Sequence, residues 1–283
     1  MTTMFKPDLL AHKKILVTGG GTGLGKSIGR HFLALGAHLV ICGRRKEVLD
    51  ATADEFRAAV AGARVDTVAC DVRDAEQVDA MMDTIWSTGP LDVLVSNAAA
   101  NFIARTDKLS PRAVDAVLGI VLHGSFYCTI AAGRRWIEAG RPGNVISTVS
   151  TPVITGQSFT APSAAAKAGV LAMTRSLAVE WGPKGIRLNC VAPGLFPTEG
   201  AWERLYPAGS QVESQEQGVP LRRFGDHREL ADLYAYLAAD GSGYLTGDLI
   251  VMDGGRWMQG VGGPTWRAMQ EWDDTQWEAM RSR

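Results

Sequence analysis

Short apolar runs alternate with longer amphipathic stretches along most of the chain. Seven apolar runs are predicted to be strands: residues 14–17, 38–42, 65–70, 91–96, 144–149, 187–192 and 249–252. Between them, apolar residues recur at helical spacing, most clearly over residues 24–35, 48–60, 78–86, 113–132 and 163–181. Strands alternating with helices of this length are typical of βαβ units. The pattern therefore predicts an α/β fold, a doubly wound parallel sheet of seven strands with helices on both faces.

The same pattern indicates one domain. No linker, repeat or break in composition occurs before about Gly255, so residues 1–283 are predicted to form a single domain. Residues 196–220 contain Pro, Gly and Gln and are weakly periodic, and they are predicted to be a lid over a substrate cleft. A plain surface loop with a short helix is the alternative.

Residues 256–283 form an aromatic tail. Four of the eight tryptophans lie there: Trp257, Trp266, Trp272 and Trp277. Aromatic residues at this density usually bury against something, which is expected to be a neighbouring subunit, the chain's own core or the substrate pocket. Thr275 and Glu278 have the spacing of a capping box and predict a terminal helix.

Composition excludes several classes of protein. Hydrophobic residues at 46% and charged residues at 21% are ordinary for a soluble domain with a large core. A net charge of -1 gives no electrostatic reason to expect nucleic acid or an anionic membrane as a partner. No apolar run approaches the roughly 18 residues of a membrane span, and residues 1–14 lack a signal-peptide pattern. A cytoplasmic protein is predicted.

The cysteines do not indicate a disulfide framework or a metal site. They are far apart in sequence, each in an apolar neighbourhood, and no CxxC is present. We expect buried free thiols and no metal.

A glycine-rich segment, TGGGTGLG at 18–25, joins the first strand to the first helix. Glycines permit a tight turn and a close approach of the backbone to a pyrophosphate, and a helix N-terminus offers free N–H groups. The strand–turn–helix context therefore predicts the nucleotide site of a Rossmann domain. Its predicted residues are Gly19, Thr22, Gly23, Leu24 and Gly25.

The end of the second strand indicates which nucleotide binds. An acidic residue there would accept hydrogen bonds from the ribose diol of NAD, but this chain has Arg44 and Arg45. Two guanidinium groups suit a 2′-phosphate, which predicts NADPH. Two solvated surface arginines are the alternative. Two further strand ends are expected to line the site: Asp71-Val72 against the adenine, and Asn97-Ala98-Ala99 against the far ribose.

Together these motifs resemble the short-chain dehydrogenase/reductase family over about residues 14–255. The resemblance rests on the TGGGTGLG turn, Asp71-Val72, Asn97-Ala98-Ala99, Lys167, Pro193-Gly194 and Asp253-Gly254-Gly255. It implies that Pro193 and Gly194 lie on the nicotinamide side of the cofactor and that Lys167 binds the nicotinamide ribose hydroxyls. It also implies a homotetramer, since the family commonly forms tetramers.

Within the family the chain most resembles the 2,4-dienoyl-CoA reductases of fatty-acid β-oxidation. The segments NAAANF (97–102), IVLHGS (120–125) and APSAAAKAGV (161–170) carry this resemblance. That subgroup has Ser in place of the family's usual Tyr four residues before the lysine, as Ser163 is here.

Two positions depart from the mitochondrial-type members of the subgroup. Pro152 stands where they carry a catalytic Tyr, and His123 stands where they carry an Asn. The more general family Asn corresponds to Val121. The peroxisomal-type members also lack the loop Tyr, so the resemblance remains compatible with the activity.

The missing tyrosine limits the chemistry. Reducing a ketone makes an alkoxide that needs a proton, which a Tyr beside a Lys supplies and a serine hydroxyl does not. Reducing a C=C bond conjugated to a thioester instead places charge on the thioester oxygen, which needs hydrogen-bond donors. Ser163 is the expected donor, His123 is expected to be a second donor or to hold a water, and Asn101 and Phe102 are expected to line the same mouth.

Each of these residues also has a structural interpretation. Lys167 could be a surface lysine, Ser163 a helix N-terminal residue, and His123 a core or interface histidine. Arg105 and Lys108 are expected near the CoA phosphates only because they follow Asn101 closely.

The sequence thus predicts an NADPH-dependent reductase of unsaturated acyl-CoA thioesters, with Lys167, Ser163 and His123 as catalytic residues. Two alternatives stay open. One is a short-chain reductase for another activated C=C or C=O substrate, and the other is a catalytically silent NADPH-binding protein.

Overall fold

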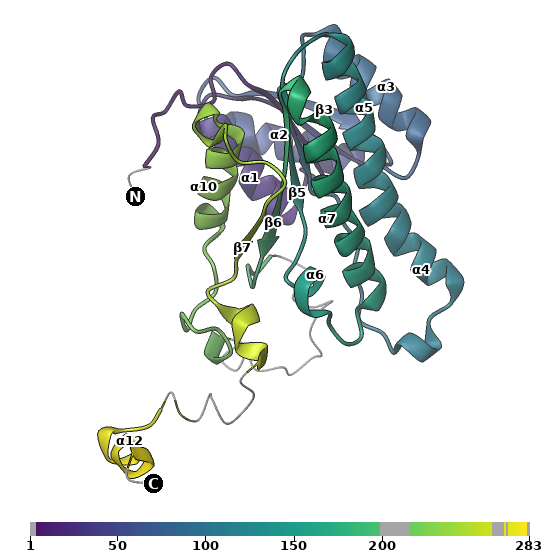
Figure 1. The fold of residues 1–283 in the computed structure, drawn as a ribbon. Helices are drawn as coiled ribbons and strands as arrows, with labels where there is room; N and C mark the ends of the chain where they lie inside the picture. Colours follow the sequence, from purple (N-terminus) through teal and green to yellow (C-terminus); the bar gives the residue numbers. More distant parts are fainter. Residues whose placement is uncertain (1–3, 199–215, 262–268, 270, 282–283) are drawn as a thin grey trace.

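Seven parallel strands form the single sheet of the computed structural model, which describes residues 4–198, 216–261, 269 and 271–281. The strand order is β3-β2-β1-β4-β5-β6-β7 (Figure 1). The strands are β1 (Lys14–Thr18), β2 (His38–Gly43), β3 (Arg64–Ala69), β4 (Val93–Ser96), β5 (Gly143–Thr148), β6 (Ile186–Pro193) and β7 (Leu249–Met252). The predicted parallel seven-stranded sheet is confirmed, with strand ends shifted by one or two residues.

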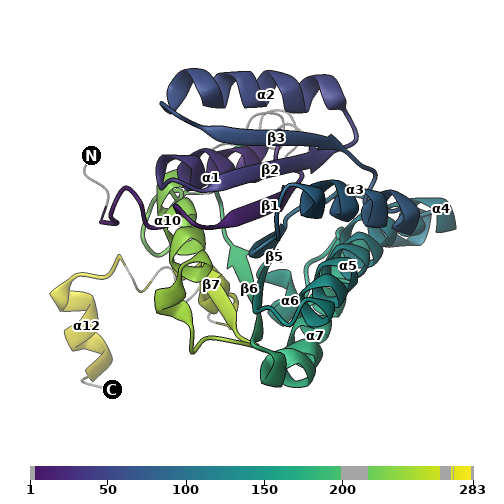
Figure 2. The same ribbon diagram turned by 90° about the horizontal axis from the view of Figure 1, so that it is seen from above.

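Helices cover both faces of the sheet (Figure 2). One layer holds α1 (Gly23–Ala34), α2 (Lys46–Ala59) and α10 (His227–Ala238). The other holds α3 (Ala75–Ser87), α4 (Pro111–Leu118), α5 (Gly124–Glu138) and α7 (Ala161–Trp181). The remaining helical segments are η1 (Thr106–Lys108), η2 (Gly119–His123), α6 (Pro152–Thr155), η3 (Gly182–Lys184), η4 (Asp240–Ser242), η5 (Arg256–Val261) and α12 (Asp274–Arg281). The strand order reverses between β1 and β4, and in such sheets ligands bind beyond the carboxyl ends of the strands at that point.

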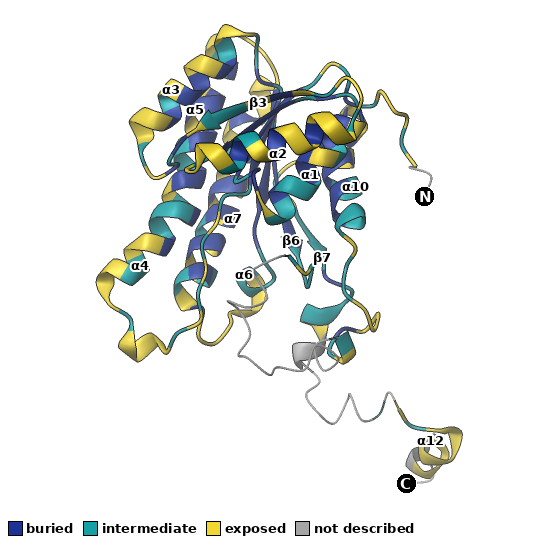
Figure 3. Cartoon of the chain, turned by 180° about the vertical axis from the view of Figure 1, so that it is seen from behind, coloured by how far each residue is buried: buried dark blue, intermediate teal, exposed yellow. Residues whose placement is uncertain are grey.

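Successive residues of the inner strand β1 pack into two separate cores. Ile15 and Val17 of β1 pack toward α1 and α10, whereas Leu16 packs toward α3 and α5. This alternation is the period of two that a strand buried on both faces requires. Figure 3 shows the result, with buried strands at the centre and the helices packed against them exposed mainly on their outer sides. All four cysteines are buried free thiols, as expected.

The long helix predicted at 113–132 extends from Pro111 to Glu138 and contains a π-helical turn, η2. Among the described residues this is the one helix whose 28 residues are long and apolar enough to cross a membrane. Half of its most apolar window is buried, and its segments pack against α3 and α7. It is therefore placed as a core helix of this domain.

Two parts of the sequence interpretation need correction. Helix α10 was not predicted, although it covers one face of the sheet. The terminal helix α12 begins earlier than the Thr275 pattern implies, since the reciprocal cap is formed by Asp273 and Gln276. The side chain of each accepts a hydrogen bond from the other's backbone N–H at 2.9 Å.

The aromatic tail and the expected lid are described only in part. Trp272 and Trp277 stack edge to face with ring centroids 5.1 Å apart, and α12 lies away from the body of the domain in Figure 1. Trp266 lies outside the described residues. Of the lid predicted at 196–220, residues 199–215 lie outside them too, so that prediction stays open.

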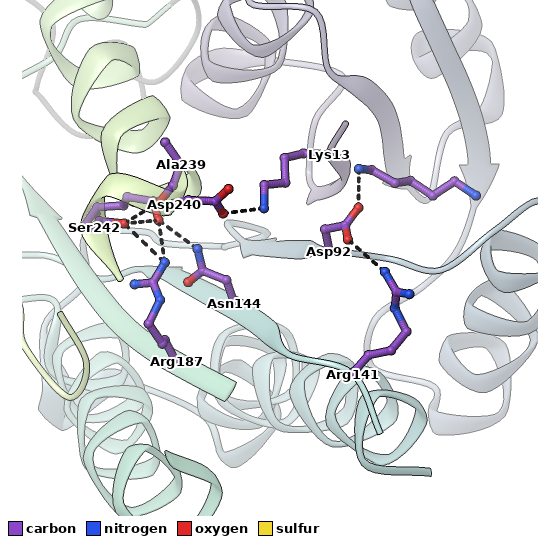
Figure 4. A network of polar contacts seen from close by, with 10 residues as sticks. Lys13, Asp92, Arg141, Asn144, Arg187, Ala239, Asp240 and Ser242 are labelled. Atoms are coloured by element: carbon purple, nitrogen blue, oxygen red, sulfur yellow. Dashed lines mark hydrogen bonds and ion pairs between the residues drawn. The ribbon is translucent and has the colours of Figure 1, made fainter. Parts of the chain in front are cut away.

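A polar network closes the end of the sheet where the strands begin (Figure 4). Arg187 and Asn144 both donate to the Leu237 carbonyl near the end of α10, at 3.2 and 2.7 Å. Lys13 pairs with Asp240 at 2.6 Å in the turn that follows. These contacts satisfy carbonyls that the end of a helix leaves unpaired, and they fix α10 to β5 and β6.

Candidate active site

A cleft of 520 Å³ lies at the carboxyl ends of β1 to β5, at the point where the strand order reverses. The structure brings most of the predicted cofactor residues, and the predicted substrate residue Asn101, together in its lining. These are Gly19, Thr22, Gly23, Leu24, Arg44, Arg45, Asp71, Val72, Asn97, Ala98, Ala99, Asn101 and Lys167. Five strand ends and one helix N-terminus therefore contribute to one concave surface.

The glycine turn has the geometry that a bound pyrophosphate needs. Gly19 and Gly23 have φ of +67° and +55°, and a Cβ on Gly19 would lie 3.1 Å from the Ala98 Cα. A Cβ on Gly25 would lie 2.6 Å from the Gly19 carbonyl oxygen, so Gly25 allows α1 to pack closely rather than lining the cleft. Thr22 makes no side-chain cap to α1, and the first turn carries no acidic residue. The N-terminus of α1 thus suits an anion.

Two arginines and a paired aspartate mark the end of the cleft beside β2 and β3. Arg44 and Arg45 are exposed, line the cleft and form no salt bridge with any residue in the described ranges. Asp71 is held by Arg73, whose Nε donates to both carboxylate oxygens at 3.0 Å. These hydrogen bonds lower the pKa of Asp71. The charge of Arg44 also lowers the pKa of Asp71. The two exposed guanidinium groups fit a ligand phosphate, and the ionised Asp71 can only accept hydrogen bonds.

Lys167 occupies the opposite end of the cleft. Its side chain is 7% exposed, and its ammonium donates to the Thr148 carbonyl at the end of β5. Burial lowers the pKa of Lys167 to about 8. The alternative of a surface lysine is therefore wrong, because a lysine is buried only where a specific polar partner holds it.

Asn97 links three of the strand ends. Its Nδ2 donates to the Thr18 carbonyl at 3.0 Å, and its Oδ1 accepts from the Thr148 hydroxyl at 3.3 Å. The backbone N–H groups of Asn97 and Ala98 both donate to the Thr18 hydroxyl at 2.9 Å. The segment after β4 is thereby fixed against β1 and β5.

A family model described as enoyl-(acyl carrier protein) reductase matches residues 19–256. A probable (2E)-enoyl-CoA-producing 2,4-dienoyl-CoA reductase of Bacillus subtilis (strain 168) is 40% identical over 251 residues, which are 87% of this chain and 97% of that protein. The peroxisomal (3E)-enoyl-CoA-producing 2,4-dienoyl-CoA reductase of Mus musculus is 34% identical, covering 90% and 87% of the two chains.

Solved structures agree with these matches. The crystal structure of a short chain dehydrogenase from Bacillus anthracis str. 'Ames Ancestor' has 40% sequence identity and a TM-score of 0.77, covering 86% of this chain and 96% of that one. Levodione reductase has 31% identity and a TM-score of 0.83, covering 88% and 99%.

The chain belongs to the short-chain dehydrogenase/reductase family. It is therefore an oxidoreductase, and its relatives imply a nicotinamide cofactor. The glycine turn, the free arginines and the buried lysine fit such a cofactor in the cleft.

This short-chain dehydrogenase/reductase has a serine beside its buried lysine. Ser163 is 8% exposed and lies one turn before Lys167 on α7, as predicted. The N-cap of α7 is Thr160, so Ser163 is the third helical residue and not the cap. Ser163 does not line the cleft, and its role as a donor stays a prediction.

His123 does not reach the cleft. It ends the π-helical turn, is exposed, and has its ring 6.1 Å from that of Tyr127. Neither residue lines the cleft. The placement thus gives no support to His123 as a second donor, and a surface or interface histidine fits it better.

Three other predicted site residues also lie outside the cleft lining. Phe102 packs against Val117 and Val121 instead of lining the mouth. Pro193 ends β6, and Gly194 lies against the next turn, where a Cβ would come within 2.5 Å of Asp253 Cβ. Their expected contacts with substrate and nicotinamide stay predictions.

The two basic residues suggested for the CoA phosphates are exposed. Arg105 and Lys108 both pair with Asp107, at 3.0 and 3.9 Å. A phosphate would have to compete with this carboxylate.

Sequence reasoning missed several residues that line the cleft. They are Gly21, Cys42, Gly43, Val48, Leu49, Cys70, Ala100, Ile120, Thr148 and Thr198. Thr148 could have been found from the sequence, because it lies at the carboxyl end of β5, the strand next to β4, whose carboxyl end leads into Asn97. Thr198 lies over the glycine turn, 3.7 Å from where a Cβ of Gly23 would be, and only its position in the expected lid pointed to it.

Proposed function

We propose that this enzyme reduces the conjugated C=C bond of 2,4-dienoyl-CoA thioesters with NADPH, as an auxiliary step of fatty-acid β-oxidation. One observation carries the proposal: Ser163 stands one helical turn before the buried Lys167, and no described tyrosine lines the cleft. The printed names of relatives at about 40% identity support the same substrate class.

The residues that would hold the cofactor follow from the cleft. The N-terminus of α1 would bind the pyrophosphate, Arg44 and Arg45 the 2′-phosphate, and Lys167 the nicotinamide ribose hydroxyls. When bound, the reduced nicotinamide supplies a hydride. No other cofactor is required by this proposal.

The protein's part in the reaction is to stabilise charge on the substrate. As the C=C bond is reduced, negative charge develops on the thioester oxygen, and a hydrogen-bond donor lowers the barrier. Ser163 is that donor in our proposal, and water delivers the proton to carbon. Asn101 lines the cleft and would orient the acyl group.

A substrate screen tests the function. Purified protein is mixed with a panel of dienoyl- and enoyl-CoA thioesters, with NADPH and NADH in parallel, and absorbance of cofactor and diene is followed. We expect turnover of a 2,4-dienoyl-CoA and at least about a twentyfold preference for NADPH, in line with two charge-assisted contacts.

Other outcomes would favour the alternatives. No turnover with any dienoyl- or enoyl-CoA would refute the proposal. Strong activity on ketones that survives Ser163→Ala would indicate a different short-chain reductase. Tight NADPH binding without turnover, together with a stable protein partner, would indicate a silent binding protein.

The cofactor preference has its own test. Because Arg44 and Arg45 form no salt bridge with any described residue, replacing both by Ala should weaken NADPH binding by about tenfold to a hundredfold. NADH binding should change by less than about twofold. Arg30→Ala, on the exposed side of α1, is the matched control, and an equal loss for both cofactors would contradict the assignment.

We also propose a homotetramer in the cytoplasm. The family resemblance supports the assembly. The word peroxisomal in some relatives' names makes fractionation of cells the deciding measurement for the compartment.

A further inference from the structure

Tyr234 of helix α10 contacts a residue of the cleft lining through a buried hydrogen bond. Its side chain is completely buried, and its hydroxyl lies 2.7 Å from the Thr148 hydroxyl. Thr148 lines the cleft, whereas Tyr234 does not. A polar group in the core is kept only where it has a partner, so this contact is the reason a tyrosine can occupy the site.

The direction of this hydrogen bond follows from its neighbours. Asn97 donates through Nδ2 to the Thr18 carbonyl, so its Oδ1 faces Thr148. The Thr148 hydroxyl donates its single proton to that Oδ1. Tyr234 must therefore donate to Thr148. Burial raises the pKa of Tyr234, so the phenol keeps the proton that this chain of bonds requires.

Thr148 is the branch point between two cleft residues. Its hydroxyl contacts Asn97, and its carbonyl accepts from the Lys167 ammonium. The backbone and side chain of one residue thus set the position of both partners.

We propose that Tyr234 is a positioning residue for the cofactor site. By fixing Thr148, it holds Lys167 and Asn97 in the arrangement that receives the nicotinamide ribose. This inference rests on the proposed use of a nicotinamide cofactor but not on the identity of the reduced substrate.

Binding of NADPH to the full-length protein tests the proposal without turnover. Tyr234→Phe keeps the ring and removes the donor. It should raise the Kd for NADPH about three- to tenfold while the protein remains folded at the assay temperature. Tyr236→Phe, on the same helix but partly exposed, should bind like wild type. A purely structural Tyr234 would lower Tm and leave the Kd of the folded protein unchanged, which would overturn the proposal.

Two variants of Thr148 test whether its hydroxyl transmits the effect of Tyr234. Thr148→Ser retains the hydroxyl and should bind nearly as wild type does, whereas Thr148→Val should bind as weakly as Tyr234→Phe. The double variant Tyr234→Phe/Thr148→Val should be no weaker than Thr148→Val alone, because the two hydroxyls act as one unit. Additive losses, or equal binding by the Ser and Val variants, would refute the link.

These outcomes are separate from those of the substrate screen. If Tyr234→Phe fails to fold, the comparison of Thr148→Ser with Thr148→Val still tests whether the hydroxyl that Tyr234 contacts sets the NADPH affinity, and equal binding by the two would overturn the proposal. If no dienoyl-CoA is reduced but the NADPH affinities follow this pattern, the proposed substrate is wrong and the role of Tyr234 stands.

Discussion

Ser163 and Lys167 are both buried on one side of α7, within one turn of each other. If Ser163 donates to the thioester oxygen, Ser163→Ala should lower kcat for a dienoyl-CoA by about a hundredfold and leave the NADPH Kd unchanged. Stopped-flow or steady-state absorbance measures the first and fluorescence titration the second.

Ser176→Ala is the control for that experiment, since Ser176 lies on the solvent side of the same helix and, among the described residues, bonds only to the Ala172 carbonyl. It should behave like wild type. Full activity in Ser163→Ala would remove Ser163 from the proposed site.

Lys167 should give the enzyme a pH dependence. Burial lowers its pKa to about 8, so its ammonium is lost as pH rises through that value. Activity should therefore fall above about pH 8 in the wild type. Lys167→Met should be about a hundredfold less active and show no such limb. A pH–rate profile of both proteins checks this.

The same residue should reduce stability at neutral pH. The folded pKa of about 8 lies below the ordinary 10.5, so the unfolded chain binds the extra proton between these values and stability rises with pH there. Below about pH 8 the penalty is present in full. Lys167→Met should then have the higher Tm at pH 7, and the gap should close toward pH 10.5. A Tm of Lys167→Met below that of the wild type at pH 7 would contradict this prediction.

Residues with a local signal could be predicted, and residues defined by tertiary contact could not. A motif and its spacing single out the glycine turn and Lys167, and both line the cleft. Tyr234 and Thr148 are 86 residues apart, and nothing local in the sequence pairs them. The expectation for His123 rested on the family resemblance alone, and the residue is exposed and outside the cleft lining.

At the scale of elements, the sequence contains the signals that predict helix α10. Asp226 and Glu229 form a capping box at its start, and Leu230, Tyr234 and Leu237 form its buried face. This is the same helical spacing that identified the other helices. In the tail the same kind of signal was assigned two residues too late, because Asp273 with Gln276 competes with Thr275 and Glu278.

The cap of α10 should make stability depend on acid pH. Glu229 accepts from Arg223 at 2.7 Å and from the Asp226 backbone at 2.9 Å. These bonds lower the pKa of Glu229 to about 2, below its ordinary 4.5. Its stabilisation is therefore present above pH 4.5 and lost as pH falls toward 2.

Glu229→Gln should accordingly lower Tm by a few degrees at pH 7 and by less at pH 3, since both side chains of the pair are partly exposed and water weakens it. Thermal unfolding at the two pH values measures this. Glu47→Gln, an exposed residue of α2, serves as control, and a constant gap across the range would argue against the assignment.

At the scale of the molecule, periodicity predicted a parallel sheet but not its strand order. The order depends on which strands lie side by side, such as β1 and β4, where the order reverses. No local feature of the sequence determines this pairing. The cleft follows from the order, because only adjacent strand ends can share ligands.

The tail gives a prediction about assembly. Helix α12 lies away from the domain, and its Trp277, which is 41% exposed, stacks on Trp272 just before the helix. If this surface meets a second subunit, a chain ending at Val261 should keep its fold and form a smaller assembly than the full chain. Light scattering after size exclusion measures both masses. Equal masses would place the subunit contact elsewhere.

Helix α10 is fastened to strand β5 at both ends of the strand. Asn144, near the start, holds the Leu237 carbonyl, and Thr148, at the end, holds the Tyr234 hydroxyl. Sliding of the helix along the strand would break both bonds at once, so these contacts oppose shear between the two elements. We therefore expect the movements that admit or release ligands to occur in other segments around the cleft. Amide protons of β5 should then exchange with solvent only when the whole domain unfolds, which hydrogen exchange would measure.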